Sequence, residues 1–156
     1  MAWYVKFDGI AGGSSNRHHF TWCNAASVNI GGHKAGGGGT GVGRVGGKMH
    51  LEVVSIGIID DRALPKLIEA AVKGHIFPKV QIHGTAIHKA AEQVYLEIEL
   101  QGAEITSYQL GVLDNNAATD DLSLTLNFAA YKSLFRDFER GGATTKFNWA
   151  LEPGEG

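Results

Sequence analysis

Hydrophobic and polar residues alternate along most of the chain, which is the pattern of half-buried β-strands. Near the N-terminus, Trp3, Val5 and Phe7 fall on one face of an extended chain, and mostly polar residues fall on the other. The same alternation returns in residues 94–100 and 122–128. The pattern predicts about seven strands, over residues 2–8, about 19–30, about 48–59, about 79–88, 94–100, 122–128 and 146–151.

One segment has helical periodicity instead. Its apolar residues recur at positions i, i+3, i+4, i+7 and i+8, as Leu64, Leu67, Ile68, Ala71 and Val72. Pro65 suits the first turn of a helix because its ring fixes φ, and Gly74 suits the C-terminal cap. The sequence therefore predicts one helix between the third and fourth strands, packed against a sheet or a barrel end.

Several breaks in the alternation predict turns and irregularities. The apolar residues change phase at Gly102, and a β-bulge there would explain the change. Residues 89–92 and the pair Gly141-Gly142 predict hairpin turns, and the polar segment 114–121 predicts a loop. Residues 131–140 fit the spacing of a helix and of a strand, and we favour the strand.

The segment from Gly31 to Gly47 is rich in glycine, which makes up ten of its 17 residues, and we expect a long loop there. Residues 41–46 have the form GxGxxG, but a dinucleotide site needs a helix after it, and residues 48–56 have strand character. A Walker A loop is excluded because Lys48 is followed by Met49. We interpret the segment as a loop that orders on meeting another protein.

Composition excludes several classes of function. The 156 residues carry 14 basic and 16 acidic side chains, which leaves no basic face for nucleic acid. No stretch approaches the roughly 18 apolar residues that cross a bilayer, and the N-terminus lacks the features of a signal peptide. Cys23 is the only cysteine, so the chain has no internal disulfide and suits a reducing compartment. We expect one domain over residues 1–151, with a disordered tail at 152–156.

The seven histidines raise the question of a metal site. His50 and Glu52 share a strand face, but no third ligand stands at a supporting spacing. His83 and His88 have opposite parity and would point apart on a regular strand. Because zinc sites need three or four converging ligands, we expect no metal site.

Catalysis also lacks candidates. Glu97 and Glu99 share a strand face about 7 Å apart, a spacing that could suit glycoside chemistry. We interpret them as the wet or interfacial face of an amphipathic strand. No Gly-x-Ser-x-Gly elbow or Cys–His arrangement is present. The sequence predicts neither an enzyme nor a cofactor site.

Several stretches resemble a known family. They are residues 4–10 (YVKFDGI), the glycine-rich loop, residues 64–70 (LPKLIEA) with the closing GHI, residues 124–129 (LTLNFA) and residues 146–149 (KFNW). In this order, over nearly the whole chain, they resemble the haemolysin-coregulated protein (Hcp) family, the tube subunits of bacterial type VI secretion.

The resemblance implies a two-sheet β-barrel with one helix, assembled as a homo-hexamer. Its rings would stack into a tube that carries effector proteins in the lumen and meets spike, baseplate and sheath proteins. The tube would assemble in the cytoplasm and leave the cell through the type VI system without a signal peptide.

We expect the subunit and ring contacts to involve the basic glycine-rich loop and an acidic loop that partners it. The residues are His33, Lys34, Gly38, Gly39, Arg44 and Lys48 in the first loop, and Asp114 and Asn115 in the second. The alternative is a monomeric β-barrel that binds a small ligand between its sheets. Self-assembly at micromolar concentration distinguishes the two.

Overall fold

A computed structural model describes residues 2–34, 49–59, 62–114 and 117–150. The elements in chain order are β1 (Ala2–Phe7), β2 (Cys23–Lys34), β3 (Met49–Ile59), α1 (Leu64–Lys73), β4 (Ile76–His88), β5 (Ala91–Asp114), β6 (Ala117–Asn127), β7 (Ala130–Asp137), a 3₁₀ turn (Phe138–Arg140) and β8 (Ala143–Ala150). The predicted fold class is confirmed, since the described chain is mainly β with its helix between the third and fourth strands. The strand favoured at 131–140 is also confirmed, as β7 with a 3₁₀ turn after it.

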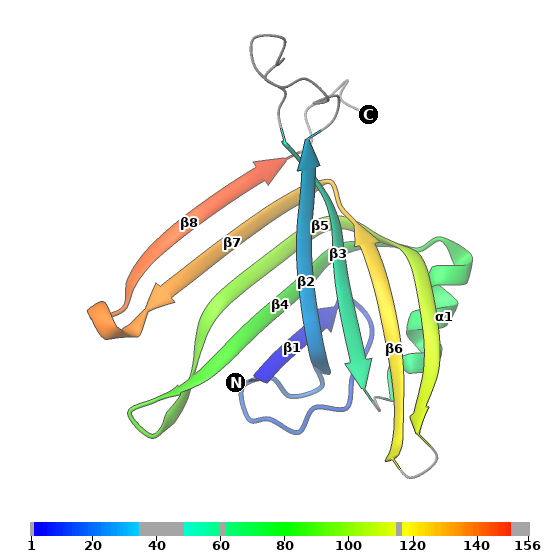
Figure 1. The fold of residues 1–156 in the computed structure, drawn as a ribbon, viewed down its shortest axis with the longest axis horizontal. Helices are drawn as coiled ribbons and strands as arrows, with labels where there is room; N and C mark the ends of the chain where they lie inside the picture. Colours follow the sequence, from blue (N-terminus) through cyan, green and yellow to red (C-terminus); the bar gives the residue numbers. More distant parts are fainter. Residues whose placement is uncertain (1, 35–48, 60–61, 115–116, 151–156) are drawn as a thin grey trace.

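All strands join in one antiparallel sheet of order β4-β1-β2-β3-β6-β5-β7-β8, and a further β4–β5 pairing closes it into a barrel. The barrel is flattened into two layers that cross (Figure 1). β2, β3 and β6 form one layer, while β1, β4, β7 and β8 form the other. β5 belongs to both, because it pairs with β7 through residues 96–101 and with β6 through residues 104–114.

The change of layer occurs at Gly102, where the sequence predicts a bulge. Gly102 has φ +61°, and buried residues switch there from Leu100 to Ala103. The register with β4 nevertheless stays constant, with Phe77 opposite Ala103 and Val80 opposite Leu100. The prediction of a bulge is therefore wrong. A bulge adds a residue to one strand only, whereas here β4 and β5 change phase together, because each strand carries one extra outward-facing residue at this point.

The core lies between the two layers. Its largest fully buried side chains include Phe7, Phe77, Leu100 and Leu124. Helix α1 contributes the buried Leu67 and packs beside β5. Pro65 lies in its first turn and Gly74 caps its end at φ +64°, both as predicted.

Two strands extend into segments that were predicted to be loops. β2 starts later than predicted, at Cys23 rather than near residue 19, but it continues through Gly31 to Lys34 into the predicted glycine loop. β6 already begins at Ala117, so most of the predicted loop at 114–121 is strand. Backbone hydrogen bonds to β3 and β5 are available along these hairpins and outweigh the weak strand propensity of the side chains. The predicted tail, 152–156, lies outside the described residues.

Candidate assembly surface

The predicted contact residues fall at two hairpin ends. His33 and Lys34 end β2, and their backbones pair with His50 and Met49 of β3. Asp114 ends β5 and pairs with the start of β6. The other predicted contact residues lie outside the described residues; they are Gly38, Gly39, Arg44, Lys48 and Asn115.

These two hairpin ends lie at opposite ends of the β3–β6 strand pair. Val54 of β3 is opposite Leu126, and Ile59 is opposite Asp121, so β3 runs from the β2–β3 hairpin toward the start of β6. In Figure 1, β2 ends at the top of the molecule and β5 at the bottom. The structure therefore does not bring Lys34 and Asp114 together within one molecule, and a contact between them needs a second copy.

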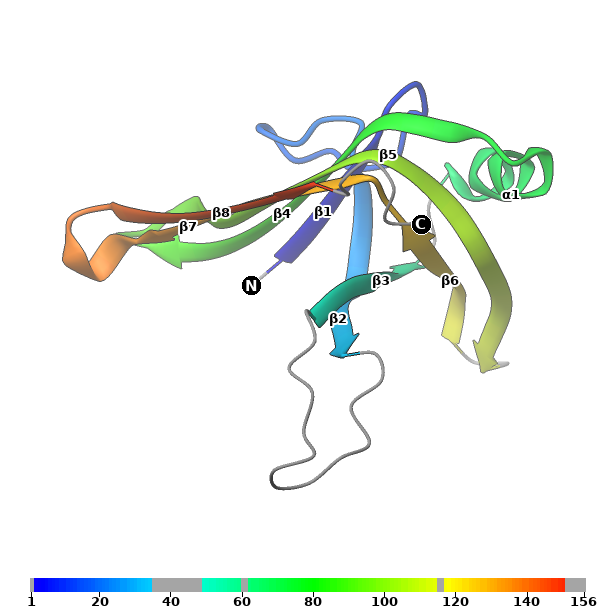
Figure 2. The ribbon, with the colours of Figure 1, turned by 90° about the horizontal axis from the view of Figure 1, so that it is seen from above.

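Strands β7 and β8 form a flange that extends beyond the other layer. Figures 1 and 2 show the flange projecting away from β2, β3 and β6. It is bare because β5 leaves the flange after Gln101 to pair with β6. One face of the flange is therefore continuous with the barrel interior, and no described strand covers it as β2, β3 and β6 cover the interior elsewhere.

The bare face of the flange is apolar. A cross-strand row runs from Val5 through Ile82 and Ile98 to Ser133 and Phe147, and directly opposed residues share a face. The first three side chains are buried, whereas Phe147 is 53% exposed. The hydrophobic interior thus continues onto the flange and becomes surface there.

Three aromatic residues of the flange, Tyr131, Phe135 and Phe147, form what we call the flange strip. Phe135 is 44% exposed, and its ring centroid lies 6.2 Å from that of Tyr95. The ring centroids of Tyr131 and Phe147 lie 6.1 Å apart. Exposed aromatic patches of this kind, next to a polar surface, are typical of protein interfaces. The sequence pattern assigned these residues to strands but gave no sign that their face lies outside the barrel.

The opposite face of the flange is charged. Glu99 lies 3.4 Å from the Nζ of Lys79 on β4 and 3.8 Å from the Nζ of Lys132 on β7. Glu97 lies 3.9 Å from Arg136. Both glutamates are engaged with basic side chains on neighbouring strands, as expected for the wet face of an amphipathic strand. Each such surface pair contributes at most about 1 kcal/mol.

Two histidines form a cluster that the sequence did not indicate. Nε2 of His19 lies 2.9 Å from Nδ1 of His83, although the residues are 64 positions apart. The His19 ring, 2% exposed, stacks on Tyr4 at 4.4 Å and meets Trp22 edge-on at 4.8 Å. Burial lowers the pKa of both histidines, which favours their neutral forms.

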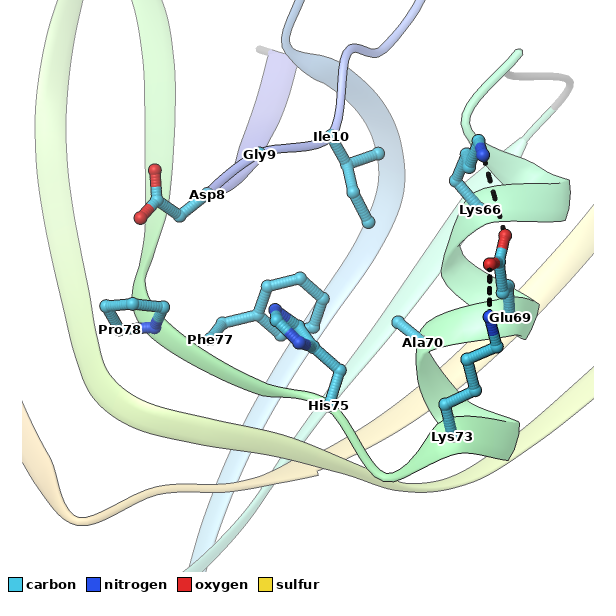
Figure 3. A pocket seen from close by; sticks show the side chains of 10 residues that line it. All are labelled: Asp8, Gly9, Ile10, Lys66, Glu69, Ala70, Lys73, His75, Phe77 and Pro78. Atoms are coloured by element: carbon cyan, nitrogen blue, oxygen red, sulfur yellow. Dashed lines mark hydrogen bonds and ion pairs between the residues drawn. The ribbon is translucent and has the colours of Figure 1, made fainter.

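A surface cleft of about 570 Å³ lies beside α1 (Figure 3). Ile10 and Phe77 supply apolar walls, and Lys66 and Lys73 on the helix both pair with Glu69, at 3.5 and 2.9 Å. The cleft is open at the surface and does not lie between the two layers. The charged side chains on the helix side of the cleft, Lys66, Glu69 and Lys73, are paired with one another.

Metal ligands and membrane spans were sought in the described part of the chain. Residues 2–34, 49–59, 62–114 and 117–150 contain no group of three or more His, Cys, Asp or Glu that could hold a metal ion. The side chains of His50 and Glu52 lie outside the described set. Within those same ranges, α1 is too short to cross a bilayer.

Comparison with known families and proteins gives one sequence match. The family described as "Type VI secretion system effector, Hcp" matches residues 4–134. A comparison with curated protein sequences finds no match.

Solved structures of similar fold carry the same description. A type VI secretion system effector from Yersinia pestis is 17% identical, with a TM-score of 0.75, covering 96% of this chain and 99% of the other. Hcp1 from Salmonella typhimurium is 20% identical, with a TM-score of 0.76, covering 96% and 94%. Hcp3 from Pseudomonas aeruginosa is 14% identical, with a TM-score of 0.66, covering 95% and 98%. At these identities the likeness concerns the fold.

Proposed function

The chain belongs to the Hcp family and is a tube subunit of type VI secretion, and we propose that six copies close into a ring through the flange. The rings then stack into a tube that carries effector proteins in its lumen. Spike, baseplate and sheath proteins are the further partners we propose. The tube assembles in the cytoplasm and leaves the cell through the type VI system.

The observation that carries this proposal is the bare flange strip. Exposed aromatic side chains that continue a buried apolar face are typical of a surface that another molecule covers, and a second copy is always present at equal concentration. In the ring that we propose, the flange of one copy contacts a different surface of the next, and such heterologous contacts close into rings when the rotation permits. Ring closure would also protect the free edge of β8, which ends the strand order.

The role we propose is structural rather than catalytic. Glu97 and Glu99 pair with basic side chains across the sheet, so neither is set apart as a general acid. The small-ligand alternative is not favoured, because buried side chains such as Phe7, Phe77 and Leu100 occupy the space between the layers.

Electron microscopy of the purified protein, with its mass in solution, tests the ring. We expect six-fold rings with an open centre at micromolar concentration. A compact monomer over a broad concentration range would contradict the proposal.

Variants of the flange strip test its role. Replacing Phe135 and Phe147 by serine should raise the concentration at which rings form by at least about tenfold, since buried aromatic anchors carry much of an interface's energy. Phe20→Ser is the matched control, because Phe20 is 68% exposed but lies outside the flange. Thermal melting checks that each variant is folded. If the variant with serine at Phe135 and Phe147 forms rings at the same concentration as the parent protein, the flange is not the contact.

A further inference from the structure

Two side chains of the segment of residues 8–22, between β1 and β2, contact His83 of β4. The rings of Trp22 and His83 lie 4.6 Å apart, measured between centroids, and the His19 ring is close enough to His83 for a hydrogen bond. Nε2 of His19 meets Nδ1 of His83 at 2.9 Å. The Oδ1 of Asn16 accepts hydrogen bonds from the backbone amides of His18 and His19, at 3.0 and 3.1 Å. The same oxygen lies 3.2 Å from Nδ1 of His19, so that nitrogen must carry a hydrogen.

These bonds fix the proton arrangement of the neutral pair. Because Nδ1 of His19 donates to Asn16, its Nε2 is an acceptor in the neutral ring, and Nδ1 of His83 donates to it. One added proton can be accommodated, since a single N–H still lies between the rings. A second cannot, because both facing nitrogens would then carry a hydrogen at 2.9 Å and both rings a positive charge.

The segment also stores backbone strain. Thr21 is β-branched but has φ +66°, in the left-handed region that such residues avoid. A residue is held there only when its surroundings over-determine it. Two contacts hold Thr21 in place. Two residues before it, the His19 ring packs between Tyr4 and Trp22, and the amide of Gly12 donates a hydrogen bond to the Thr21 carbonyl at 2.6 Å.

We propose that the His19–His83 contact is an acid-sensitive latch, which holds residues 8–22 on β4 and releases them when both imidazoles are protonated. The device goes beyond tube assembly and does not depend on it. Release would move Phe20, and it would move Gly9 and Ile10 at the rim of the cleft beside α1.

Charged and titratable groups face the pair from every neighbouring element. They are Tyr4 from β1, His18 from the segment itself, Glu92, Glu97 and Glu99 from β5, Lys132 and Arg136 from β7, and Lys146 from β8. Burial is the largest effect and lowers the pKa of both histidines. Glu92 raises the pKa of His19 and Glu97 that of His83, whereas a neighbouring histidine lowers each, His18 for His19 and His19 for His83. Arg136 already pairs with Glu97, which weakens that carboxylate's pull on His83.

The sign of the pH dependence follows from the lowered pKa values. The unfolded or released chain binds protons near the ordinary histidine pKa of about 6.5, and the latched chain binds them at lower pH. The latch is therefore fully stabilising above about pH 6.5 and weakens as the pH falls below it.

Hydrogen exchange of the intact protein, followed by mass spectrometry, tests the latch. We expect peptides from residues 12–22 to lose at least about tenfold protection between about pH 7.5 and pH 5, after correction for intrinsic exchange rates. Peptides from β6 should keep their protection. A loss of equal size in β6 would indicate general unfolding and overturn the proposal, as would unchanged protection of residues 12–22.

The variant His83→Asn identifies the contact. The asparagine amide occupies the place of Nδ1 and can turn either its oxygen or its NH₂ toward His19, so acid no longer forces two donors together. Residues 12–22 of this variant should stay protected at about pH 5. His75→Asn, one residue before β4 and outside the cluster, should behave like the parent protein. Loss of protection in His83→Asn equal to that of the parent would exclude the latch.

Discussion

Single residues in this fold are often fixed by how closely two backbone segments approach. Gly12 is the sharpest case, because a Cβ atom there would lie 2.5 Å from the carbonyl oxygen of Trp22 and 2.6 Å from the amide nitrogen of Cys23. Backbone atoms cannot yield as a flexible side chain can. The entry into β2 therefore requires glycine at this position, for reasons of space alone.

Gly12→Ala should destabilise the protein by about 1–3 kcal/mol, because the added methyl group forces the backbone at Gly12 away from the backbone of Trp22 and Cys23. Urea unfolding, followed by circular dichroism, measures the change. Gly111→Ala is the matched control, since a Cβ at Gly111 meets nothing within 4 Å, and its effect should stay within about 0.5 kcal/mol. Equal stability of the two variants would show that the approach at Gly12 relaxes freely.

Sequence reasoning at this scale succeeds where the signal is local. Pro65 and Gly74 bound the helix as predicted, because capping depends on residues within one turn. The pair His19–His83 was missed. Alternation compares the side-chain directions of residues on one strand, so His83 was tested only against residues near it in the sequence. Its partner lies 64 positions away, on a segment that was expected to be strand.

At the scale of elements, strand pairing decides boundaries that composition leaves open. β2 was expected to stop before Gly31, yet β2 and β3 pair as far as Lys34 and Met49. The alternation of residues located the change of phase at Gly102, but it did not show that β4 changes phase at the same place. Pro78 lies opposite Gly102 in the β4–β5 register. In the sequence of one strand, a change of phase shared with its neighbour looks the same as a bulge.

The hairpin between β2 and β3 leads to an element-scale prediction. Deleting residues 36–41 should leave the barrel folded, because the described β2–β3 pairs, as far as Lys34 and Met49, are retained, but it should shorten or abolish tubes. Circular dichroism melting and electron microscopy measure the two effects separately. Replacing the same six residues by a Gly-Ser linker of equal length is the control for loop length. Long tubes from the shortened protein would show that this loop takes no part in stacking.

The whole molecule combines a closed barrel with an open flange. The barrel buries its own core, whereas the same apolar face on β7 and β8 remains bare, with Phe135 and Phe147 exposed. The sequence predicted the barrel because alternation marks half-buried strands. It could not predict the flange, since a residue that faces a neighbouring molecule and one that faces the core give the same alternation.

The two hairpin ends give the molecule a polarity that can be tested by exchanging charges. Lys34 and Asp114 lie at opposite ends of the β3–β6 pair, so an attraction between them acts only between stacked copies. Asp114→Lys should shorten tubes and leave single rings intact, because it puts a like charge opposite the basic loop. Lys34→Asp should do the same from the other side.

The double variant Lys34→Asp with Asp114→Lys restores opposite charges and should recover tube length in part. Electron microscopy gives the tube length, and solution mass confirms that rings persist. The single-variant defects should also become smaller above about 0.5 M salt, where exposed charges are screened within a few ångströms. If the double variant stacks no better than either single one, the acidic hairpin end is not the partner of the basic loop, and stacking depends on other surfaces.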